Sequence, residues 1–351
     1  MNVRISAGRS FREGRNILIR GTNWIGDAVM TLSAIAAVRQ TFPQAKITIL
    51  VKPWVAELFN LSPDIDEIML FQSPGIHEGL SGKWRLVRDL KERKFDTAIL
   101  LQNAIEAAII TLLAGIPVRA GYDSDVRGSL LTHSVERTKA VRKVHQTAYY
   151  LEMVRSLGCE PVGGDVYLKP GREYDLLADA LFRRFGLEKN GLLVGMAPGA
   201  AYGPAKKWFS ERFSEVAERL GDAFSPQIIL FGSAGDADSA KAVQKHTKYL
   251  LNDLTGQTSL KEAIALMSRC RLFISNDSGL MHVAAALGVP TVAIFGSTNP
   301  ATTAPVGRQT VVIHKEVSCS PCLRKTCPTD FRCMEMISVD DVYGAAIRFM
   351  E

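Results

Sequence analysis

The sequence predicts an α/β protein made of two Rossmann-like domains, each with a parallel sheet. Short apolar runs typical of buried strands alternate with helical stretches through both halves of the chain. At 351 residues the chain is long for one domain, which favours two of similar size. A segment rich in Gly and Pro at 158–172 marks the boundary. We therefore expect a basic tail at 1–15, domains at 16–165 and 173–338, and a final helix within 339–351 that is a candidate to cross back onto the first domain.

The first half alternates strands and helices from residue 16 onward. Apolar runs predict strands at 16–20, 46–51, 67–71, 95–101 and 117–122. Helical periodicity predicts helices at 28–40, 54–61, 83–93, 104–114 and 146–157. The first helix has Val29, Leu32 and Ile35 on one face, and Phe42-Pro43 ends it.

The second half repeats the alternation. It predicts strands at 191–196, 227–231, 250–251, 271–275 and 291–295. The helices between and after them are expected at 173–185, 208–220, 236–247, 260–268, 280–287 and 339–350. Because ligands of such sheets bind where strands end and helices begin, the turns after these strands are the places to look for a site.

Composition narrows the class of protein and its partners. The net charge of +6 suits anionic ligands, whereas the absence of a block of consecutive Lys and Arg argues against a nucleic-acid partner. The N-terminus lacks the apolar core of a signal peptide, and no run approaches the roughly 18 apolar residues of a membrane-spanning helix. These features predict a cytoplasmic protein, with peripheral association with a membrane left open.

Glycine-containing turns follow several strands, but none has a dinucleotide or P-loop signature. No G-x-G-x-x-G occurs, and Gly21-x4-Gly26 continues with Asp27 instead of Lys. Asp27 lies at a helix start, where it is either an N-cap or a carboxylate that can take a proton from an alcohol. The loop at 197–207 offers backbone N–H groups and Lys206 to a diphosphate, unless its lysines are simply solvated.

Two further turns are ambiguous in the same way. Gly232–Asp236 is either a site for a ribose or base, or an ordinary turn that Asp236 caps. Asn276, Asp277 and Ser278 are preferred N-cap residues that can also bind a ligand. A lone helical histidine such as His282 is usually structural, and metal binding by Asp277 with His282 lacks an evident further ligand.

Four cysteines cluster near the C-terminus, at Cys319, Cys322, Cys327 and Cys333. Clustered cysteines in a cytosolic protein suggest metal before disulfides. Their C-x2-C-x4-C-x5-C spacing departs from the two separated pairs of the usual zinc pattern, so free thiols are the simpler interpretation and a structural metal or iron–sulfur centre the alternative.

Three stretches carry a specific resemblance. They read GTNWIGDAVMTLSA at 21–34, APGAAYGPAKKW at 197–208 and NDSGLMHVAAALGVPTVAIFGSTNP at 276–300. Together they resemble the lipopolysaccharide heptosyltransferases, glycosyltransferase family nine. The AYGPAK form and the cysteine segment are most similar to the heptosyltransferase II branch. The resemblance implies the GT-B fold, in which two Rossmann-like domains face each other across a cleft.

The resemblance also implies a reaction. Family members transfer L-glycero-D-manno-heptose with inversion from ADP-heptose, held by the C-terminal domain, to an acceptor held by the N-terminal domain. For this branch the acceptor is the first heptose of the lipopolysaccharide inner core on lipid A–Kdo. No cofactor and no metal on the diphosphate is expected. The partners are then a nucleotide sugar and an anionic lipopolysaccharide precursor at the cytoplasmic face of the inner membrane. A related transferase with another donor or acceptor, and a non-catalytic nucleotide- or glycan-binding protein, are the alternatives.

By the same resemblance, Asp27 matches the proposed general base and Lys206 the lysine at the donor phosphates. The donor-binding candidates are Ala200, Ala201, Tyr202, Gly203, Gly232, Asp236, Asp277, Ser278, Gly279, Leu280 and His282. The acceptor-binding candidates are Trp24, Lys52, Arg119, Arg127, Arg142 and Lys143, whose cations could equally be solvated surface charges.

Overall fold

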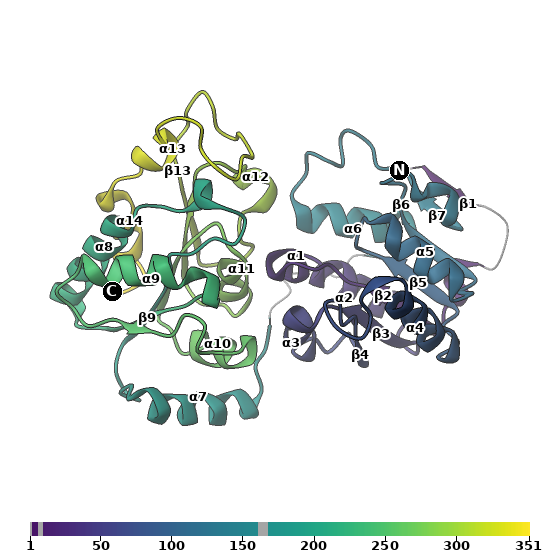
Figure 1. The fold of residues 1–351 in the computed structure, drawn as a ribbon, viewed down its shortest axis with the longest axis horizontal. Coiled ribbons are helices and arrows are strands. Elements are labelled where there is room, and N and C mark those ends of the chain that lie inside the picture. The colour runs from purple at the N-terminus through teal and green to yellow at the C-terminus, as the bar shows by residue number, and fades with distance from the viewer. Residues whose placement is uncertain (1, 6–9, 161–167) are drawn as a thin grey trace. The chain divides into compact units, whose positions relative to one another are not determined.

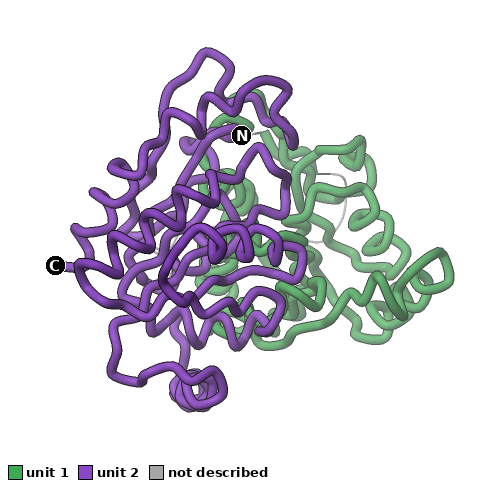
Figure 2. The backbone as a smooth tube through the Cα atoms, turned by 60° about the vertical axis from the view of Figure 1, so that its left-hand side comes forward, with its two compact units in different colours: residues 1–166 green, residues 167–351 purple. Residues whose placement is uncertain are grey.

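The chain divides into two compact units, Met1–Val166 and Tyr167–Glu351, which Figure 2 colours separately. A computed structural model describes residues 2–5, 10–160 and 168–351. The expected boundary at 158–172 includes residues 161–167, which lie outside the described residues. Each unit is described by itself below.

Unit 1 is built on a seven-stranded sheet in the order β1-β7-β6-β5-β2-β3-β4 (Figure 1). Every neighbouring pair is parallel except β1 on β7. The strands are β1 (Val3–Ile5), β2 (Asn16–Arg20), β3 (Lys46–Val51), β4 (Glu67–Leu70), β5 (Thr97–Leu100), β6 (Val118–Tyr122) and β7 (His133–Val135). The helices are α1 (Ile25–Met30), α2 (Leu32–Thr41), α3 (Ala56–Asn60), α4 (Gly79–Glu92), α5 (Ile105–Leu113) and α6 (Gln146–Ser156).

Unit 2 has a six-stranded sheet, all parallel, in the order β10-β9-β8-β11-β12-β13. Its strands are β8 (Leu193–Ala197), β9 (Gln227–Leu230), β10 (Asn252–Asp253), β11 (Leu272–Asn276), β12 (Thr291–Phe295) and β13 (Thr310–His314). Its helices are α7 (Arg172–Phe185), α8 (Ser210–Phe224), α9 (Ala237–Lys245), α10 (Leu260–Met267), α11 (Gly279–Ala286), α12 (Pro300–Thr303), α13 (Arg332–Glu335) and α14 (Val339–Ile347).

Both sheets therefore confirm the predicted α/β class with parallel strands, and both reverse their strand order once. The reversal falls between β2 and β5 in unit 1, and between β8 and β11 in unit 2. At such a point the loops leave neighbouring strands in opposite directions and open a crevice at the carboxyl edge of the sheet. The predicted site residues Asp27, Lys206 and Asp277 all follow one of these four strands.

The segment expected as a basic tail at 1–15 is part of the unit 1 fold in the residues that the structure describes. β1 pairs with the edge strand β7, and Phe11 is buried against Phe42 with ring centroids 5.4 Å apart. Strand pairing and the burial of one aromatic ring give regular structure to this segment, although its polar composition predicted no regular structure.

The predicted helix at 28–40 also differs from the structure. Its first turn begins earlier, at Ile25, and the helix is interrupted at Thr31, whose hydroxyl donates to the Ala28 carbonyl at 2.6 Å. Hydroxyl back-bonding of this kind commonly bends a helix.

The last helix does not leave its own unit. α14 packs against α8 and β12, and its Val342 and Ala346 are part of the unit 2 core. The apolar face of α14 thus packs within unit 2, and a contact of residues 339–351 with the first domain stays a prediction. Among the described helices, none is long and apolar enough to cross a membrane.

A glycine in the central strand of unit 2 provides a test of this packing. A Cβ on Gly195 would lie 2.5 Å from Cδ2 of Phe273, whereas a Cβ on Gly344, within α14, would meet nothing within 4 Å. We expect Gly195→Ala to lower the free energy of unfolding by about 1–3 kcal/mol through overpacking. Gly344→Ala, the matched control, should raise it by about 0.5–1 kcal/mol because alanine favours the helix. Urea unfolding followed by circular dichroism measures both, and equal stability of Gly195→Ala and wild type would contradict the packing described.

Candidate functional site

The best-defined polar cluster lies at the strand-order reversal of unit 2. The buried side chain of Asn276, the last residue of β11, joins the two loops there. Its amide nitrogen donates to the Pro198 carbonyl at 2.7 Å, and its oxygen accepts from the Trp208 backbone N–H at 2.9 Å. The loop that follows β8 is therefore held at both ends against the turn that follows β11.

That arrangement brings Lys206 and Asp277 together. Lys206 Nζ lies 2.6 Å from Asp277 Oδ2, and the two side chains are only 15% and 5% exposed. The Thr298 hydroxyl donates to the same carboxylate oxygen at 2.5 Å. Lys206 Nζ also lies 5.0 Å from the centre of the Tyr202 ring. A largely buried ammonium with a fixed counter-ion is a point charge whose position is set before any ligand arrives.

The polar residues at the start of α11 do not act as simple helix caps. Ser278 is the N-cap residue, yet its side chain makes no cap hydrogen bond; it lies 3.0 Å from the Ser275 hydroxyl. Asp277 is engaged by Lys206 and Thr298, and Asn276 by the loop after β8. The capping interpretation of this turn is wrong. Gly279 and Leu280 begin α11, and His282 is buried within it.

Asp236 stands beside two of the predicted donor turns. Its Oδ2 accepts from the Ser233 backbone N–H at 2.9 Å and hydroxyl at 2.8 Å, a capping box. A Cβ on Gly199 would lie 2.1 Å from Asp236 Oδ1, and one on Gly232 would lie 2.8 Å from its Cβ. The turns after β8 and β9 thus approach this carboxylate so closely that only glycine fits. Asp236 both caps and lines the edge of the sheet.

The segment that carries the cysteines supports the loop that carries Lys206. The Tyr202 hydroxyl donates to the Leu323 carbonyl at 2.8 Å, and the Ala205 N–H donates to the Lys325 carbonyl at 3.0 Å. Gly203 has a φ of 152°, and a Cβ there would lie 2.5 Å from the Lys325 carbonyl oxygen. This contact was not foreseen, because the two segments are far apart in sequence.

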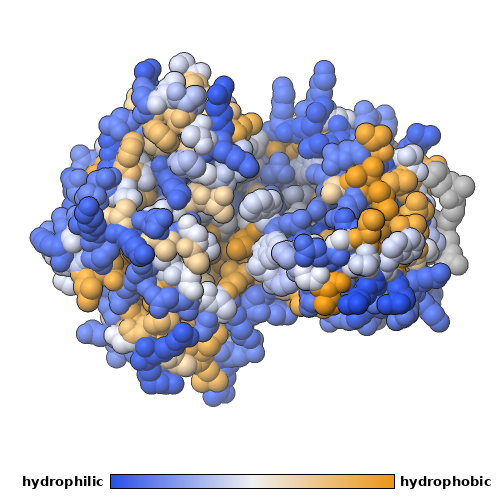
Figure 3. Space-filling view, in the orientation of Figure 1, coloured by the Kyte–Doolittle hydropathy of each residue, from blue (hydrophilic) through white to orange (hydrophobic). Residues whose placement is uncertain are grey.

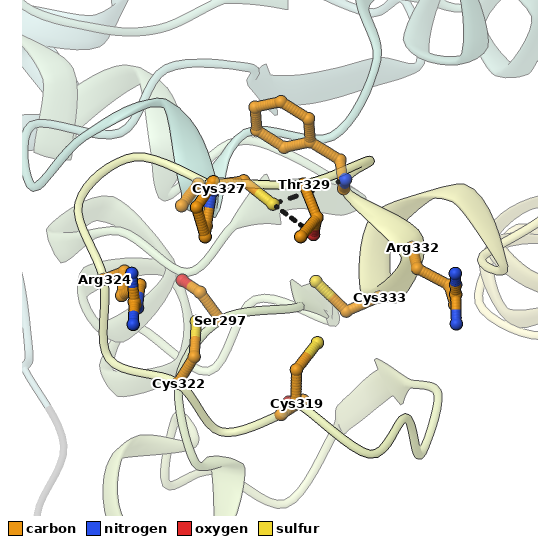
Figure 4. Close-up of a pocket in the computed structure, with 12 residues that line it drawn as sticks. Ser297, Cys319, Cys322, Arg324, Cys327, Thr329, Arg332 and Cys333 are labelled. Atoms are coloured by element: carbon orange, nitrogen blue, oxygen red, sulfur yellow. Dashed lines mark hydrogen bonds between the residues drawn. The ribbon is translucent and has the colours of Figure 1, made fainter.

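The four clustered cysteines surround one cavity of about 350 Å³ (Figure 4). Cys319 is exposed and Cys333 is buried, while the Phe331 N–H donates to Cys327 Sγ at 3.4 Å. As arranged in the described part of the chain, no group of three or more His, Cys, Asp or Glu side chains could hold a metal ion. The hydroxyl of Ser297, buried on the wall of the cavity, has no hydrogen-bond partner among the described residues.

In unit 1, Asp27 is half-buried in the first turn of α1, two residues past its first residue, so it is not the N-cap. Its negative charge acts on Tyr150, a buried residue of α6. Burial first, and then the charge of Asp27, raise the pKa of Tyr150 well above its usual value. The sequence did not predict that Tyr150 lies near Asp27, because a tyrosine at the core spacing of a helix is usually a packing residue.

Arg20 and Lys52 are buried at the carboxyl edge of the unit 1 sheet. Arg20 is the last residue of β2, and Lys52 directly follows β3. Lys52 Nζ donates to the Ser73 carbonyl and lies 4.0 Å from the centre of the Phe71 ring. Burial, followed by the charge of Arg20, lowers the pKa of Lys52. Burial lowers the pKa of Arg20 itself to about 10. Arg20, missed from sequence, holds the turn before Asp27 by donating to the Asn23 side chain at 2.9 Å.

Two of the arginines predicted to bind the acceptor donate hydrogen bonds to backbone carbonyls within unit 1. Arg127 is completely buried, and its guanidinium donates to backbone carbonyls of Tyr122 (2.8 Å), Gln102 and Leu100 (3.3 Å). Burial lowers the pKa of Arg127 to about 10. Arg119 donates to the carbonyls of Leu130 at 2.9 Å and Ile116 at 2.6 Å. The assignment of Arg127 is wrong, because its donors are used inside the protein. Arg119 is only half-buried, and its acceptor role stays a prediction.

The other acceptor candidates remain on the surface. Arg142 and Lys143 are exposed in the segment between β7 and α6, and Trp24 is 63% exposed in the turn before α1. Nothing within unit 1 tests their predicted role.

Comparison with known proteins gives a consistent result. The family model described as glycosyltransferase family 9 (heptosyltransferase) matches residues 83–331. The chain is 31% identical to lipopolysaccharide heptosyltransferase 2 of Escherichia coli K12 over 85% of its length and 87% of that protein. It is 31% identical to lipooligosaccharide heptosyltransferase 2 of Haemophilus ducreyi over 85% and 88%. The solved structure of Escherichia coli ADP-heptose LPS heptosyltransferase II superposes with a TM-score of 0.82, at 26% identity, covering 95% of this chain and 98% of that one.

The structural role of Arg127 can be separated from binding. Replacing it in Arg127→Met leaves several buried carbonyls without donors, and we expect the free energy of unfolding to fall by about 3 kcal/mol. The exposed control Arg142→Ala should change it by less than about 0.5 kcal/mol. Chemical unfolding of both variants measures this. Wild-type stability of the Arg127→Met protein would contradict the structural role of Arg127.

Proposed function

Because the chain belongs to glycosyltransferase family 9 and is a heptosyltransferase, we propose that it moves L-glycero-D-manno-heptose from ADP-heptose to the first heptose of the lipopolysaccharide inner core. The observation that carries the donor half of this proposal is the buried pair of Lys206 and Asp277, held by Asn276 at the strand-order reversal of unit 2. Ligands of open α/β sheets bind at such reversals.

The diphosphate of the donor would be neutralised by groups of unit 2. Lys206 supplies a positive charge, and the N–H groups of the loop at 200–203 and of the start of α11 supply hydrogen bonds. Asp277 holds the ammonium in place. As the bond between the anomeric carbon and the diphosphate breaks, negative charge grows on the leaving oxygen, and fixed cations lower the energy of that transition state. Asp236, Gly232 and Ser278 would contact the nucleoside portion and the sugar, with Ala200, Ala201 and His282 shaping the site.

The proton of the acceptor hydroxyl would go to Asp27. The acceptor oxygen forms its bond to the anomeric carbon on the face opposite ADP, which departs with the electron pair of the broken bond, so the anomeric configuration inverts. The neutral phenol of Tyr150 close to Asp27 would help to orient the carboxylate. We propose that this transfer needs no metal on the diphosphate, since Lys206 and the backbone N–H groups supply the positive potential.

The acceptor would be recognised through its anionic groups. Lys52, Arg142 and Lys143 are the cations of unit 1 that we retain for its phosphates and carboxylates, with Trp24 as an exposed aromatic surface for a sugar. Because Lys52 has a lowered pKa, it loses its charge at a lower pH than an ordinary lysine. Acceptor binding should then weaken as the pH rises into the alkaline range and Lys52 loses its charge.

A transfer assay tests the assignment of the base. With ADP-heptose and a lipid A–Kdo–heptose acceptor, Asp27→Asn should lower kcat by about 10²–10⁴-fold, because the amide cannot take the proton. Donor binding should be unchanged. Asp175→Asn, which alters an exposed aspartate in the first turn of α7, is the matched control and should keep wild-type kcat. The assay is run with and without EDTA.

Several outcomes would contradict the proposal. Wild-type turnover by Asp27→Asn would remove it as the base, and loss of activity in EDTA would require a metal. Release of UDP or GDP from other nucleotide sugars, with no ADP released from ADP-heptose, would favour a related transferase with another donor. Binding of ADP-heptose without turnover on any acceptor would favour a binding protein.

The state of the four cysteines is a separate prediction. We expect Cys319, Cys322, Cys327 and Cys333 to be thiols in the reduced protein. Cys319, which is exposed, and Cys327, whose pKa is lowered by hydrogen bonds with Thr329, should react with a thiol reagent before the buried Cys333. Cys159 and Cys270 should react only on unfolding, since burial raises the pKa of both and takes that of Cys159 to about 11. Thiol titration with elemental analysis checks this, and one bound metal ion per chain would show instead a structural metal site.

A further inference from the structure

The outer face of α5 is apolar although it is exposed. Ile105, Ile109, Leu112 and Leu113 are between 39% and 47% exposed. Their spacing of four, three and one residues places them on one side of the helix. The opposite side, with Ala107, Ala108 and Ile110, is buried in the unit 1 core. A surface helix of a globular protein normally has a polar outer face, whereas α5 is apolar on its outer side as well as on its inner side.

The neighbouring helix extends the same surface. α4 and α5 contact each other, and Lys83 of α4 pairs with Glu106 of α5 at 2.7 Å. The inner residues Leu86 and Leu90 of α4 share the core that buries α5. On its outer side α4 presents Leu80, which is 81% exposed, and Trp84, which is 60% exposed. We call these six side chains the α4–α5 face. Figure 3 shows hydrophobic surface gathered over the part of unit 1 that Figure 1 labels α5.

The charges around the α4–α5 face are mainly positive. Arg85, Arg88 and Lys91 are exposed on α4. Two nearby acids already have partners, since Glu106 pairs with Lys83 and Asp89 lies 3.6 Å from His77. Glu78 and Glu92 stand at the two ends of α4.

A second group of cations begins with Arg137, which lies close to the residues before α5. Arg137 stacks on the Tyr149 ring at 5.5 Å, and the Tyr149 hydroxyl is bonded to the side chain of Asn103, two residues before α5. From Arg137 the chain continues through Lys139, Arg142 and Lys143 with no acidic residue before Glu152. Cations therefore lie along α4, and Arg137 lies near the residues that precede α5.

We propose that the α4–α5 face docks onto an anionic lipid bilayer. Leu and Ile side chains with a Trp, flanked by Arg and Lys, are the composition of elements that lie in the membrane interface. The apolar side chains enter the boundary of the acyl chains, and the cations pair with lipid phosphates. A second copy of the chain fits less well, because self-pairing of this face would bring Arg85, Arg88 and Lys91 against the same cations.

The docking surface deepens the proposed function without depending on its donor chemistry. An acceptor built on lipid A lies in a membrane, so an enzyme held at the bilayer meets it in two dimensions. Unit 1 carries both this face and the cations retained for the acceptor, Lys52, Arg142 and Lys143. The inference would stand for any lipid-borne acceptor.

The test compares binding of the full chain to two kinds of vesicle by co-sedimentation. We expect wild type to bind vesicles of phosphatidylethanolamine with phosphatidylglycerol, and to bind phosphatidylcholine vesicles at least about tenfold more weakly, because the phosphates and cations contribute. The double variant Ile109→Ser with Leu112→Ser should bind the anionic vesicles at least about tenfold more weakly than wild type. Leu176→Ser, which removes a still more exposed leucine from α7 of unit 2, is the control and should bind as wild type does.

Activity separates this proposal from the proposed function. With a water-soluble acceptor freed of its acyl chains, the double variant should turn over at the wild-type rate; with acceptor embedded in vesicles it should be slower. Equal vesicle binding by the double variant and wild type would overturn the docking surface, whatever the transfer activity. Sedimentation showing a wild-type dimer that the double variant dissociates would also overturn it, and would assign the face to self-association. Vesicle binding without any transfer from ADP-heptose would leave the docking surface and refute the function.

Discussion

The candidate donor site depends on one buried amide. Asn276 donates to the Pro198 carbonyl and accepts from the Trp208 N–H, so a single side chain satisfies two backbone groups on a loop remote in sequence. Only an amide offers a donor and an acceptor in this geometry; a carboxylate would be left facing the carbonyl. With the loop held at both ends, Lys206 reaches Asp277 and the charge is in place before a ligand binds. Preorganised charge of this kind is what stabilises a departing diphosphate.

In unit 1, too, one buried side chain joins two loops at the end of the sheet, but at a greater energetic cost. Its buried Arg127 ties together carbonyls that follow β5 and end β6, in the way that Asn276 ties loops in unit 2. The turn that delivers it has Asp125 and Val126 at φ of 53° and 60°. A β-branched residue in that region is strained by about 1–3 kcal/mol. Burial of a cation adds a desolvation penalty, which the carbonyl hydrogen bonds offset.

Periodicity and turn chemistry predicted most of the fold. Strands such as β2, β8 and β11 follow from continuous apolar runs, and Asp27, Lys206 and Asp277 come after their carboxyl ends as expected. Contacts between distant segments were not predictable in the same way. The pairing of β1 with β7, the burial of Arg127 and the support of Tyr202 by Leu323 depend on which segments the folded sheet brings together. In a basic stretch of sequence, an arginine that is exposed to solvent cannot be distinguished from one that is buried and donates to backbone carbonyls.

The position of the loop that carries Lys206 is restricted by its contacts with the segment at 319–333. Gly203 lies against the Lys325 carbonyl, Ala205 donates to that oxygen, and Tyr202 donates to the Leu323 carbonyl. The segment at 319–333 therefore fixes the conformation of the loop that carries Lys206. An insertion or deletion between Cys322 and Cys327 would displace the ammonium of Lys206 from its counter-ion without altering either residue. Sequence drift in this peripheral segment is constrained by the chemistry of a loop that precedes it by more than a hundred residues.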